Sequence, residues 1–144
     1  MQKVFATALL VGGGVAFAYW TTTGSGTGSA AAGDSSPVTV TQTNTVTGLY
    51  PGGSAQNIDL NIANSNAAAQ RLETVAVSVS STSNAGCTAA DFTVTDATIG
   101  AEVPSGATNA YAGATTGATI KMKNAVTSQD ACKNVTINLA FNAS

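Results

Sequence analysis

The chain has 144 residues, of which only 8% are charged, with 5 Lys or Arg, 7 Asp or Glu and no His. An ordinary soluble domain carries about a quarter charged residues. The lack of His excludes His-ligated metal sites and catalysis by a His base, so we expect no enzyme, no metal and no cofactor. Nucleic acid is also an unsuitable partner, because phosphate neutralisation needs clustered Lys and Arg.

Residues 1–20 have the features of a secretory signal peptide. Lys3 precedes an uncharged apolar stretch that ends in an A-x-A pattern formed by Ala16 and Ala18, and these three features together mark such a leader. We predict that residues 1–18 are removed before Tyr19, leaving a protein that is secreted or retained at the cell surface. The alternative is an uncleaved anchor, since residues 4–20 as a helix would measure about 25 Å against a hydrocarbon core of about 30 Å. Contact with the membrane is expected only in that case.

Residues 19–37 consist mainly of Gly, Ser, Thr and Ala with a single charge. Such a segment has too little apolar surface to offset the entropy of ordering, and we predict a flexible linker. Residues 38–144 form the only segment with a core pattern, and we expect one domain there.

From residue 38 onward, apolar residues alternate with polar ones, which is typical of antiparallel strands that bury one face. This pattern occurs in residues 38–46, 58–62, 75–79, 92–95, 120–123 and 135–141. We therefore predict an all-β fold, a single immunoglobulin-like Greek-key β-sandwich of about 6–8 antiparallel strands. Short helical turns are expected only within 67–70 and 110–118. Residues 99–116 are either a long crossing loop or a further pair of short strands.

Cys87 and Cys132 are the only cysteines. In an exported protein we expect them to form a disulfide, worth about 4 kcal/mol in the chain-entropy model. Both lie in predicted loops, and a disulfide holds the two Cα atoms within about 7 Å. The two loops should therefore lie at the same end of the sandwich. A redox or metal-binding thiol pair is the alternative, but the C-x-x-C spacing is missing.

Asp91 and Asp130 stand in the loops beside the two cysteines. A small Ca²⁺ site is one interpretation, but it needs several oxygen ligands, and the sequence has no Asp-rich repeat. We expect solvated loop carboxylates. The Thr-rich strand faces are likewise expected to be solvated, with a flat array for binding sugar, ice or a partner strand as the alternative.

The predicted first strand, from Val38 to Val46, is uncharged and follows the flexible linker. An unprotected strand at the edge of a sheet pairs readily with another chain. Homo-assembly through this strand is therefore the alternative to a monomeric domain.

Two short patterns resemble known families. The sequence LYPGG at 49–53, followed by IDLNIAN at 58–64, resembles the opening of bacterial secreted Ig-like domains. The segments CTAADF at 87–92 and QDAC at 129–132 resemble the cysteine-bearing segments of small surface proteins of that kind. The junction at Ala18, Tyr19 and Trp20 is similar to that of camelysin/TasA-type biofilm matrix proteins, whose processed subunits build surface fibres.

The resemblance implies an exported, non-enzymatic module with a structural or interaction role at the cell surface, and an unknown protein or cell-envelope partner. The alternative function is that of a subunit of an extracellular surface or biofilm fibre, assembled through its N-terminal strand.

Overall fold

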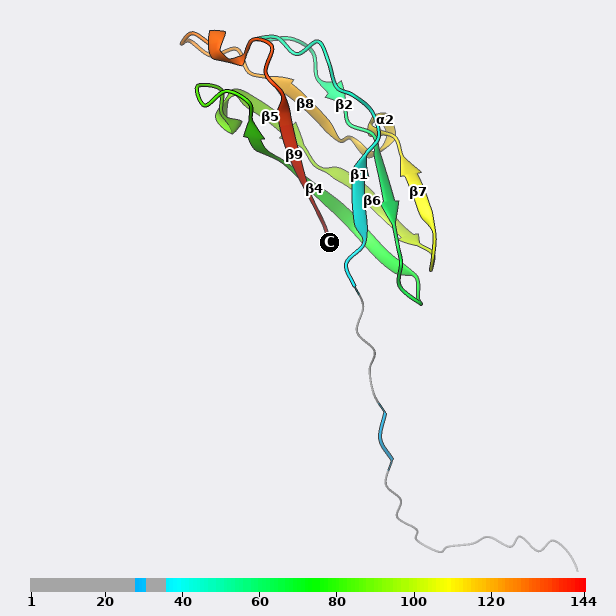
Figure 1. Ribbon diagram of the computed structural model, residues 1–144. Helices are drawn as coiled ribbons and strands as arrows, with labels where there is room; N and C mark the ends of the chain where they lie inside the picture. The colour runs from blue at the N-terminus through cyan, green and yellow to red at the C-terminus, as the bar shows by residue number, and fades with distance from the viewer. Residues whose placement is uncertain (1–27, 31–35) are drawn as a thin grey trace, which may run out of the picture. The chain divides into compact units, whose positions relative to one another are not determined.

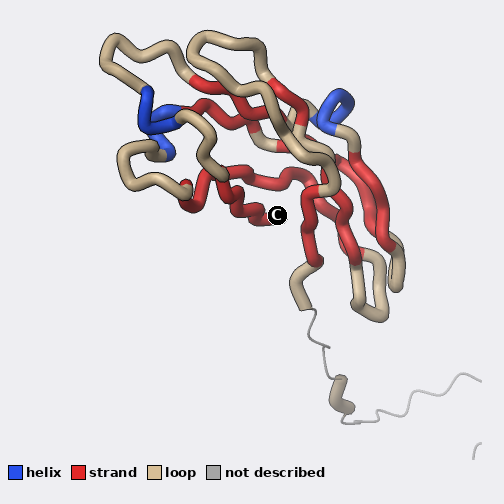
Figure 2. Tube along the Cα trace, turned by 45° about the horizontal axis from the view of Figure 1, so that its top comes forward, coloured by secondary structure: helices blue, strands red, loops and turns tan. Residues whose placement is uncertain are grey.

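The computed structural model describes residues 28–30 and 36–144, and most of its regular structure is β-strand (Figure 1). The strands are β1 (Thr39–Gln42), β2 (Gln56–Asn57), β3 (Leu60–Ala63), β4 (Gln70–Thr82), β5 (Phe92–Thr95), β6 (Ala97–Val103), β7 (Thr108–Tyr111), β8 (Thr119–Met122) and β9 (Ile137–Ala143). The helical elements are η1 (Ala89–Asp91), α2 (Gly113–Thr116) and η2 (Asp130–Cys132). They are short pieces in the connections between strands (Figure 2).

The strands form three antiparallel sheets, in the orders β1-β3-β7, β2-β8-β5 and β6-β4-β9. The first two sheets are continuous along the chain, because β2 leads into β3 and β7 leads through α2 into β8. The backbone N–H of Ile58 donates to the carbonyl of Ala118 over 2.9 Å, and this hydrogen bond also links the two sheets. These two sheets therefore act as one surface of the core, opposite the sheet built around β4.

The chain passes from one surface to the other at Asp96, between β5 and β6. β5 pairs with β8, whereas β6 pairs with β4. The carboxylate of Asp96 accepts a hydrogen bond of 2.9 Å from the backbone N–H of Val77 in β4. This bond replaces a ladder bond at the crossing point and closes that side of the fold.

The core lies between these surfaces and contains mostly residues of moderate size. Its buried members are Ile58, Leu60, Ile62, Leu72, Val75, Val77, Cys87, Phe92, Ala97, Val103, Ala118, Ile120 and Met122. Strand β9 contributes none of them, because its inward residues are only half-buried. The core is thus well covered around β3, β4 and β8, and less so at the β9 side.

The prediction of an all-β fold is confirmed, with differences at the strand ends. β1 stops at Gln42 rather than reaching residue 46, because the Asn44 side chain takes over the pairing: it donates to the carbonyl of Asn57 and accepts from the N–H of Asp59. β9 begins at Ile137, two residues later than predicted, and β4 is much longer than residues 75–79. Of the alternatives for residues 99–116, the one with further strands is correct: β6 and β7 occupy this region, β6 paired with β4 and β7 paired with β3.

The helical turn considered within 67–70 does not form. The side-chain amide of Asn64 instead donates to the carbonyl of Ala68 over 2.9 Å, and β4 already begins at Gln70. The turn within 110–118 exists as α2.

No helix in residues 28–30 and 36–144 is long and apolar enough to cross a membrane. The predicted leader, residues 1–18, and most of the predicted linker lie outside the described residues.

Candidate functional site

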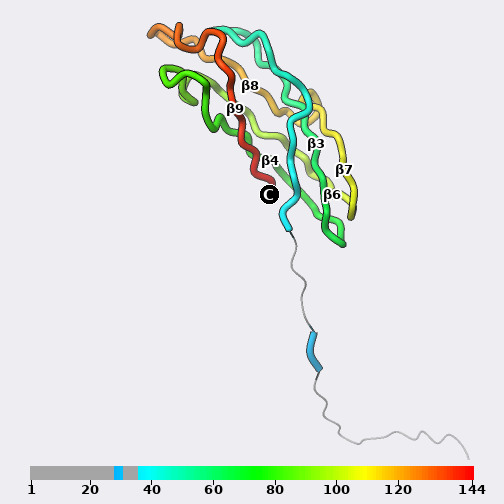
Figure 3. Tube along the Cα trace, in the orientation of Figure 1, coloured from blue at the N-terminus to red at the C-terminus, as the bar shows by residue number. Residues whose placement is uncertain are grey.

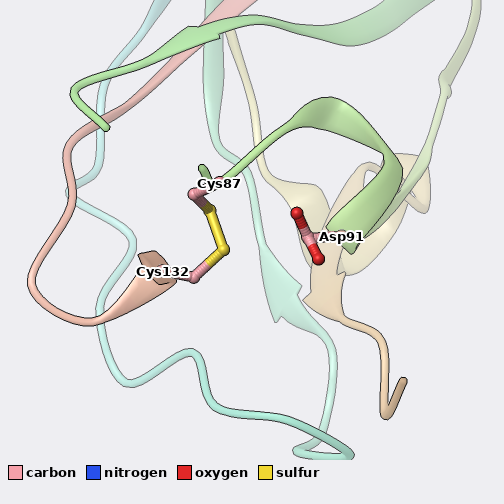
Figure 4. Close-up of side chains that lie close together, drawn as sticks. All are labelled: Cys87, Asp91 and Cys132. Carbon is pink, nitrogen blue, oxygen red and sulfur yellow. A yellow bond between two sulfur atoms is a disulfide. The ribbon is translucent and has the colours of Figure 1, made fainter. Parts of the chain in front are cut away.

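The structure contains the predicted disulfide, which joins Cys87 in the loop after β4 to Cys132 in η2 (Figure 4). The two Cα atoms are 4.9 Å apart, so the loops do meet at one end of the fold. Gly86 permits this close approach, since a Cβ atom there would lie 2.9 Å from the Cβ atom of Ala131. The Cys87 side chain is buried in the core, which makes the link part of the packing.

Asp91 connects the same two loops by hydrogen bonds. One carboxylate oxygen accepts from the backbone N–H of Thr88 over 2.8 Å, and the other accepts from the Gln129 side-chain amide over 3.1 Å. The Thr88 bond, and then the Gln129 bond, favour the ionised form and lower the pKa of Asp91 below its ordinary value of 3.8. Asp91 is therefore a structural carboxylate that reinforces the disulfide.

The ligand-type atoms of Cys87, Asp91 and Cys132 lie within 4.8 Å of one another, which is the spacing of a metal site. The two sulfur atoms are bonded to each other, however, and metal binding by cysteine needs the thiolate. Asp91 lies beside the disulfide (Figure 4), and its carboxylate already accepts hydrogen bonds from Thr88 and Gln129. As long as the disulfide is intact, this cluster is a covalent link between loops rather than a metal centre.

Asp130 has a different partner. It forms a salt bridge of 2.8 Å with Lys133, three residues further along, and both side chains are largely exposed. The pair lowers the pKa of Asp130 and raises the pKa of Lys133, in each case first through their hydrogen bond and then through their opposite charges. Asp91 and Asp130 thus serve two separate interactions, in keeping with loop carboxylates rather than a shared Ca²⁺ site.

The predicted cleavage residues Ala16, Ala18 and Tyr19 lie outside the described residues.

A second candidate region is the gap between β1 and β9, which lie side by side as edge strands of different sheets (Figures 1 and 3). We call this gap the β1–β9 seam. Its half-buried apolar residues, which pack against the core but remain partly open to solvent, are Val38, Val40, Val46, Leu49, Val135, Ile137, Leu139, Phe141 and Ala143.

The seam is hollowed along both halves of β9. A cavity of about 500 Å³ lies beside the first half and is lined by the segment 42–46, Leu49, Ile120, residues 135–137 and Leu139. Another of about 400 Å³ lies beside the second half, between residues 36–38, Val40, Gln70, Leu72 and residues 141–143. The two cavities open along the two halves of β9, beside the edge of β1, and each is lined by both polar and apolar side chains.

The sequence pattern identified the strand from Val38 onward as an edge, but not the partner edge at β9. Alternation alone assigns the residues of β9 to an interior face and cannot tell a central strand from an edge strand. A usable signal was present in the charges: residues 134–144 contain none. The chain matches no protein-family model, no curated protein and no solved structure.

Proposed function

We propose that this protein is an exported, non-enzymatic Ig-like domain that serves as a structural or interaction module at the cell surface. The order of its strands supports the Ig-like part of the proposal. Such domains place strands A, B, E and D in one sheet and C, F and G in the other. Here β1, β2 with β3, β7 with β8, and β5 take the places of A, B, E and D, while β4 and β9 take those of C and F. Strand β6, which pairs with β4, is an addition to this order. A final strand G beside β9 has no counterpart among the described residues.

Export is supported by the disulfide together with the leader-like pattern of residues 1–18. Disulfides persist in oxidising compartments and are rare in the cytosol of most cells. The Cys87–Cys132 link is buried on the Cys87 side and joins two loops of the folded core. It therefore suits a domain that stays oxidised throughout its working life.

The observation that carries the interaction role is the β1–β9 seam. Strand edges with apolar residues between them are where proteins add a strand from another chain. The polar groups at the other candidate site, the disulfide-linked loops, already form hydrogen bonds or a salt bridge within the protein. The seam is the part of the described chain best suited to contact a partner.

The proposal is tested by expressing the tagged full chain in its source cells and analysing the fractions. We expect to find the protein outside the cytoplasm, where a membrane-impermeant amine reagent can label it. Its intact mass should be that of the chain beginning at Tyr19, and 2 Da below that of the form with two free thiols. Material confined to the cytoplasm with both thiols free to alkylation would contradict the proposal.

The alternative role as a fibre subunit is favoured by one feature of β1. This strand has four residues and carries no charge, and within the described part of the chain it pairs only with β3, so exchange between copies breaks few bonds. Electron microscopy of the exported protein distinguishes the two roles, because strand exchange along a chain of copies gives filaments and the first role does not require them.

A further inference from the structure

Strand β9 presents to the seam a row of backbone groups that have no partner among residues 28–30 and 36–144. Ser144 and Thr74 exchange two backbone hydrogen bonds, of 3.0 and 3.2 Å. This pair determines which residues of β9 direct their backbone N–H and C=O groups toward β4. In an antiparallel ladder, successive residues point alternately to one neighbour and to the other. Asn142 and Ala140 therefore bond to β4.

The N–H and C=O groups of the intervening residues point away from β4. These residues are Ala143, Phe141, Leu139 and, beyond the bulge opposite Ser81, Ile137. They are also the residues whose side chains face the half-open core. A strand added here would thus gain backbone hydrogen bonds and cover apolar side chains at the same time.

The β9 edge also lacks the features that prevent strand addition at other edges. Natural proteins protect such edges with charged residues, bulges or proline. Strand β5 has Asp91 and Asp96 at its two ends, and β6 carries Glu102 together with a left-handed Gly100 at φ +57°. Residues 134–144, by contrast, contain neither a charge nor a proline.

The β9 sequence, Ile-Asn-Leu-Ala-Phe-Asn-Ala, is complementary to itself when a second copy runs antiparallel about a two-fold axis at Ala140. In this register Ile137 lies opposite Ala143 of the second copy, and Leu139 lies opposite Phe141. These are the residues with free backbone groups, so they fall in the hydrogen-bonded pairs of the ladder. One inward pair joins Ile137 to the small side chain of Ala143, and the other joins the large apolar side chains of Leu139 and Phe141. On the outer face, Asn138 lies opposite Asn142.

We propose that the seam binds a second copy of this chain, with the two β9 strands pairing about Ala140 to make one continuous six-stranded sheet, β6-β4-β9 from each copy. This proposal names the partner of the interaction module and rests on the proposed function. The predicted linker, residues 19–37, offers no alternating apolar strand for this site, because apart from Tyr19 and Trp20 at its start and Pro37 at its end it contains no apolar side chain larger than that of Ala. The edges that meet are uncharged, so the copies do not repel each other there, although the chain carries a net charge of −2.

The first experiment uses charge variants of the exported full protein in sedimentation equilibrium. We expect a dimer for the unmodified protein. Ala140→Lys and Ala140→Glu should each weaken dimerisation by about tenfold or more, because two like charges then face each other across the axis. An equimolar mixture of the two variants should restore dimers, since Lys then faces Glu. Ala76→Lys is the matched control: Ala76 is exposed on the neighbouring strand β4, opposite Asn142, and should leave the dimer intact.

The rescue by mixing separates loss of the interface from loss of the fold, because an unfolded β9 is not restored by a second unfolded copy. Amide hydrogen exchange provides an independent readout. The N–H groups of Ile137, Leu139, Phe141 and Ala143 should become protected as the protein concentration rises, while those of Ala140 and Asn142 should be protected at every concentration.

A monomer at all accessible concentrations would overturn this proposal. So would an oligomer that is insensitive to the Ala140 variants and leaves the Leu139 and Phe141 amides in fast exchange. Either result leaves the proposed export and surface role intact if the protein is still found outside the cell with its disulfide formed. Failure of export with free thiols refutes the proposed function whatever the oligomeric state.

Discussion

Replacing Gly113 by Ala should destabilise the domain more than any other single-methyl change in the α2 connection. A Cβ atom at Gly113 would lie 2.6 Å from the backbone nitrogen and 2.7 Å from the backbone oxygen of Ile58, and 2.8 Å from the carbonyl oxygen of Ala118. These are backbone atoms in the short links between β2 and β3 and between α2 and β8, and two of them, Ile58 N and Ala118 O, share the hydrogen bond that joins the first two sheets. They cannot move aside as the end of a flexible side chain can.

The expected cost follows from these contacts. Overpacking in a well-filled interior costs about 1–3 kcal/mol, and loss of the bond between Ile58 and Ala118 adds about 1 kcal/mol. The backbone N–H of Gly113 also donates to Asp59 over 2.7 Å, and a shift of α2 weakens this bond too. We therefore expect Gly113→Ala to lower the free energy of unfolding by about 2–4 kcal/mol.

Urea denaturation followed by circular dichroism measures this loss, with an unchanged m-value as the sign that the same transition is observed. Gly117→Ala is the matched control in the same connection. Gly117 has a φ of +83° but no atom within 4 Å of its missing Cβ, so only the left-handed backbone is penalised, by about 1 kcal/mol. If Gly113→Ala costs no more than Gly117→Ala, the close approach between α2 and Ile58 does not exist in solution.

Three further predictions concern the disulfide, a buried amide and acid stability. Replacing both Cys87 and Cys132 by Ala should lower the free energy of unfolding by about 4 kcal/mol, measured in urea, with the wild type in reductant as a second estimate. Asn64→Ala should cost about 2 kcal/mol or more in the same assay, because the buried Asn64 amide donates to the carbonyl of Val103 over 2.8 Å and that carbonyl loses its partner. The folded pKa of Asp91 is lowered below 3.8, so its contribution is fully present above pH 3.8 and is lost as the pH falls through the folded pKa. Asp91→Asn should therefore be less stable than wild type near pH 6, and the difference should shrink towards pH 2 in urea titrations.

Most of the strands were predictable because burial of one face of a strand requires apolar and polar residues to alternate along the sequence. Ile58, Leu60 and Ile62 show this clearly, and all three are buried. The pairing of Cys87 with Cys132 was predictable for a different reason, since a chain with two cysteines allows only one intramolecular disulfide. Both inferences depend only on the order of neighbouring residues or on the number of cysteines, and both are read directly from the sequence.

The features that the sequence did not predict arise from contacts between distant segments. Asn64 looks like an ordinary turn residue, and only the fold brings Val103 close enough to accept its amide and bury it. Gly113 lies in an Ala- and Gly-rich stretch. Only Gly fits at this position because a Cβ atom would collide with the backbone of Ile58, which is far away in sequence. The crossing at Asp96 was missed because an acidic residue between two apolar segments is typical of a turn. In the structure its carboxylate instead accepts a hydrogen bond from the backbone of Val77 in β4.

The distribution of charge in the domain connects the fold to the proposed assembly. Every charged side chain from residue 35 onward lies between Asp59 and Lys133, so the segments 35–58 and 134–144, which supply β1 and β9, have none. A domain selected to remain monomeric is expected to place charge at exposed strand edges, because a few lysines suffice to block pairing. Here the scarce charges are found on loops, on the central strands β4 and β8 and on the edge strand β6, and they include Lys121 of β8, Glu102 of β6 and the Asp130–Lys133 pair. The edges that border the seam carry no charge to block pairing, and this favours association through β9.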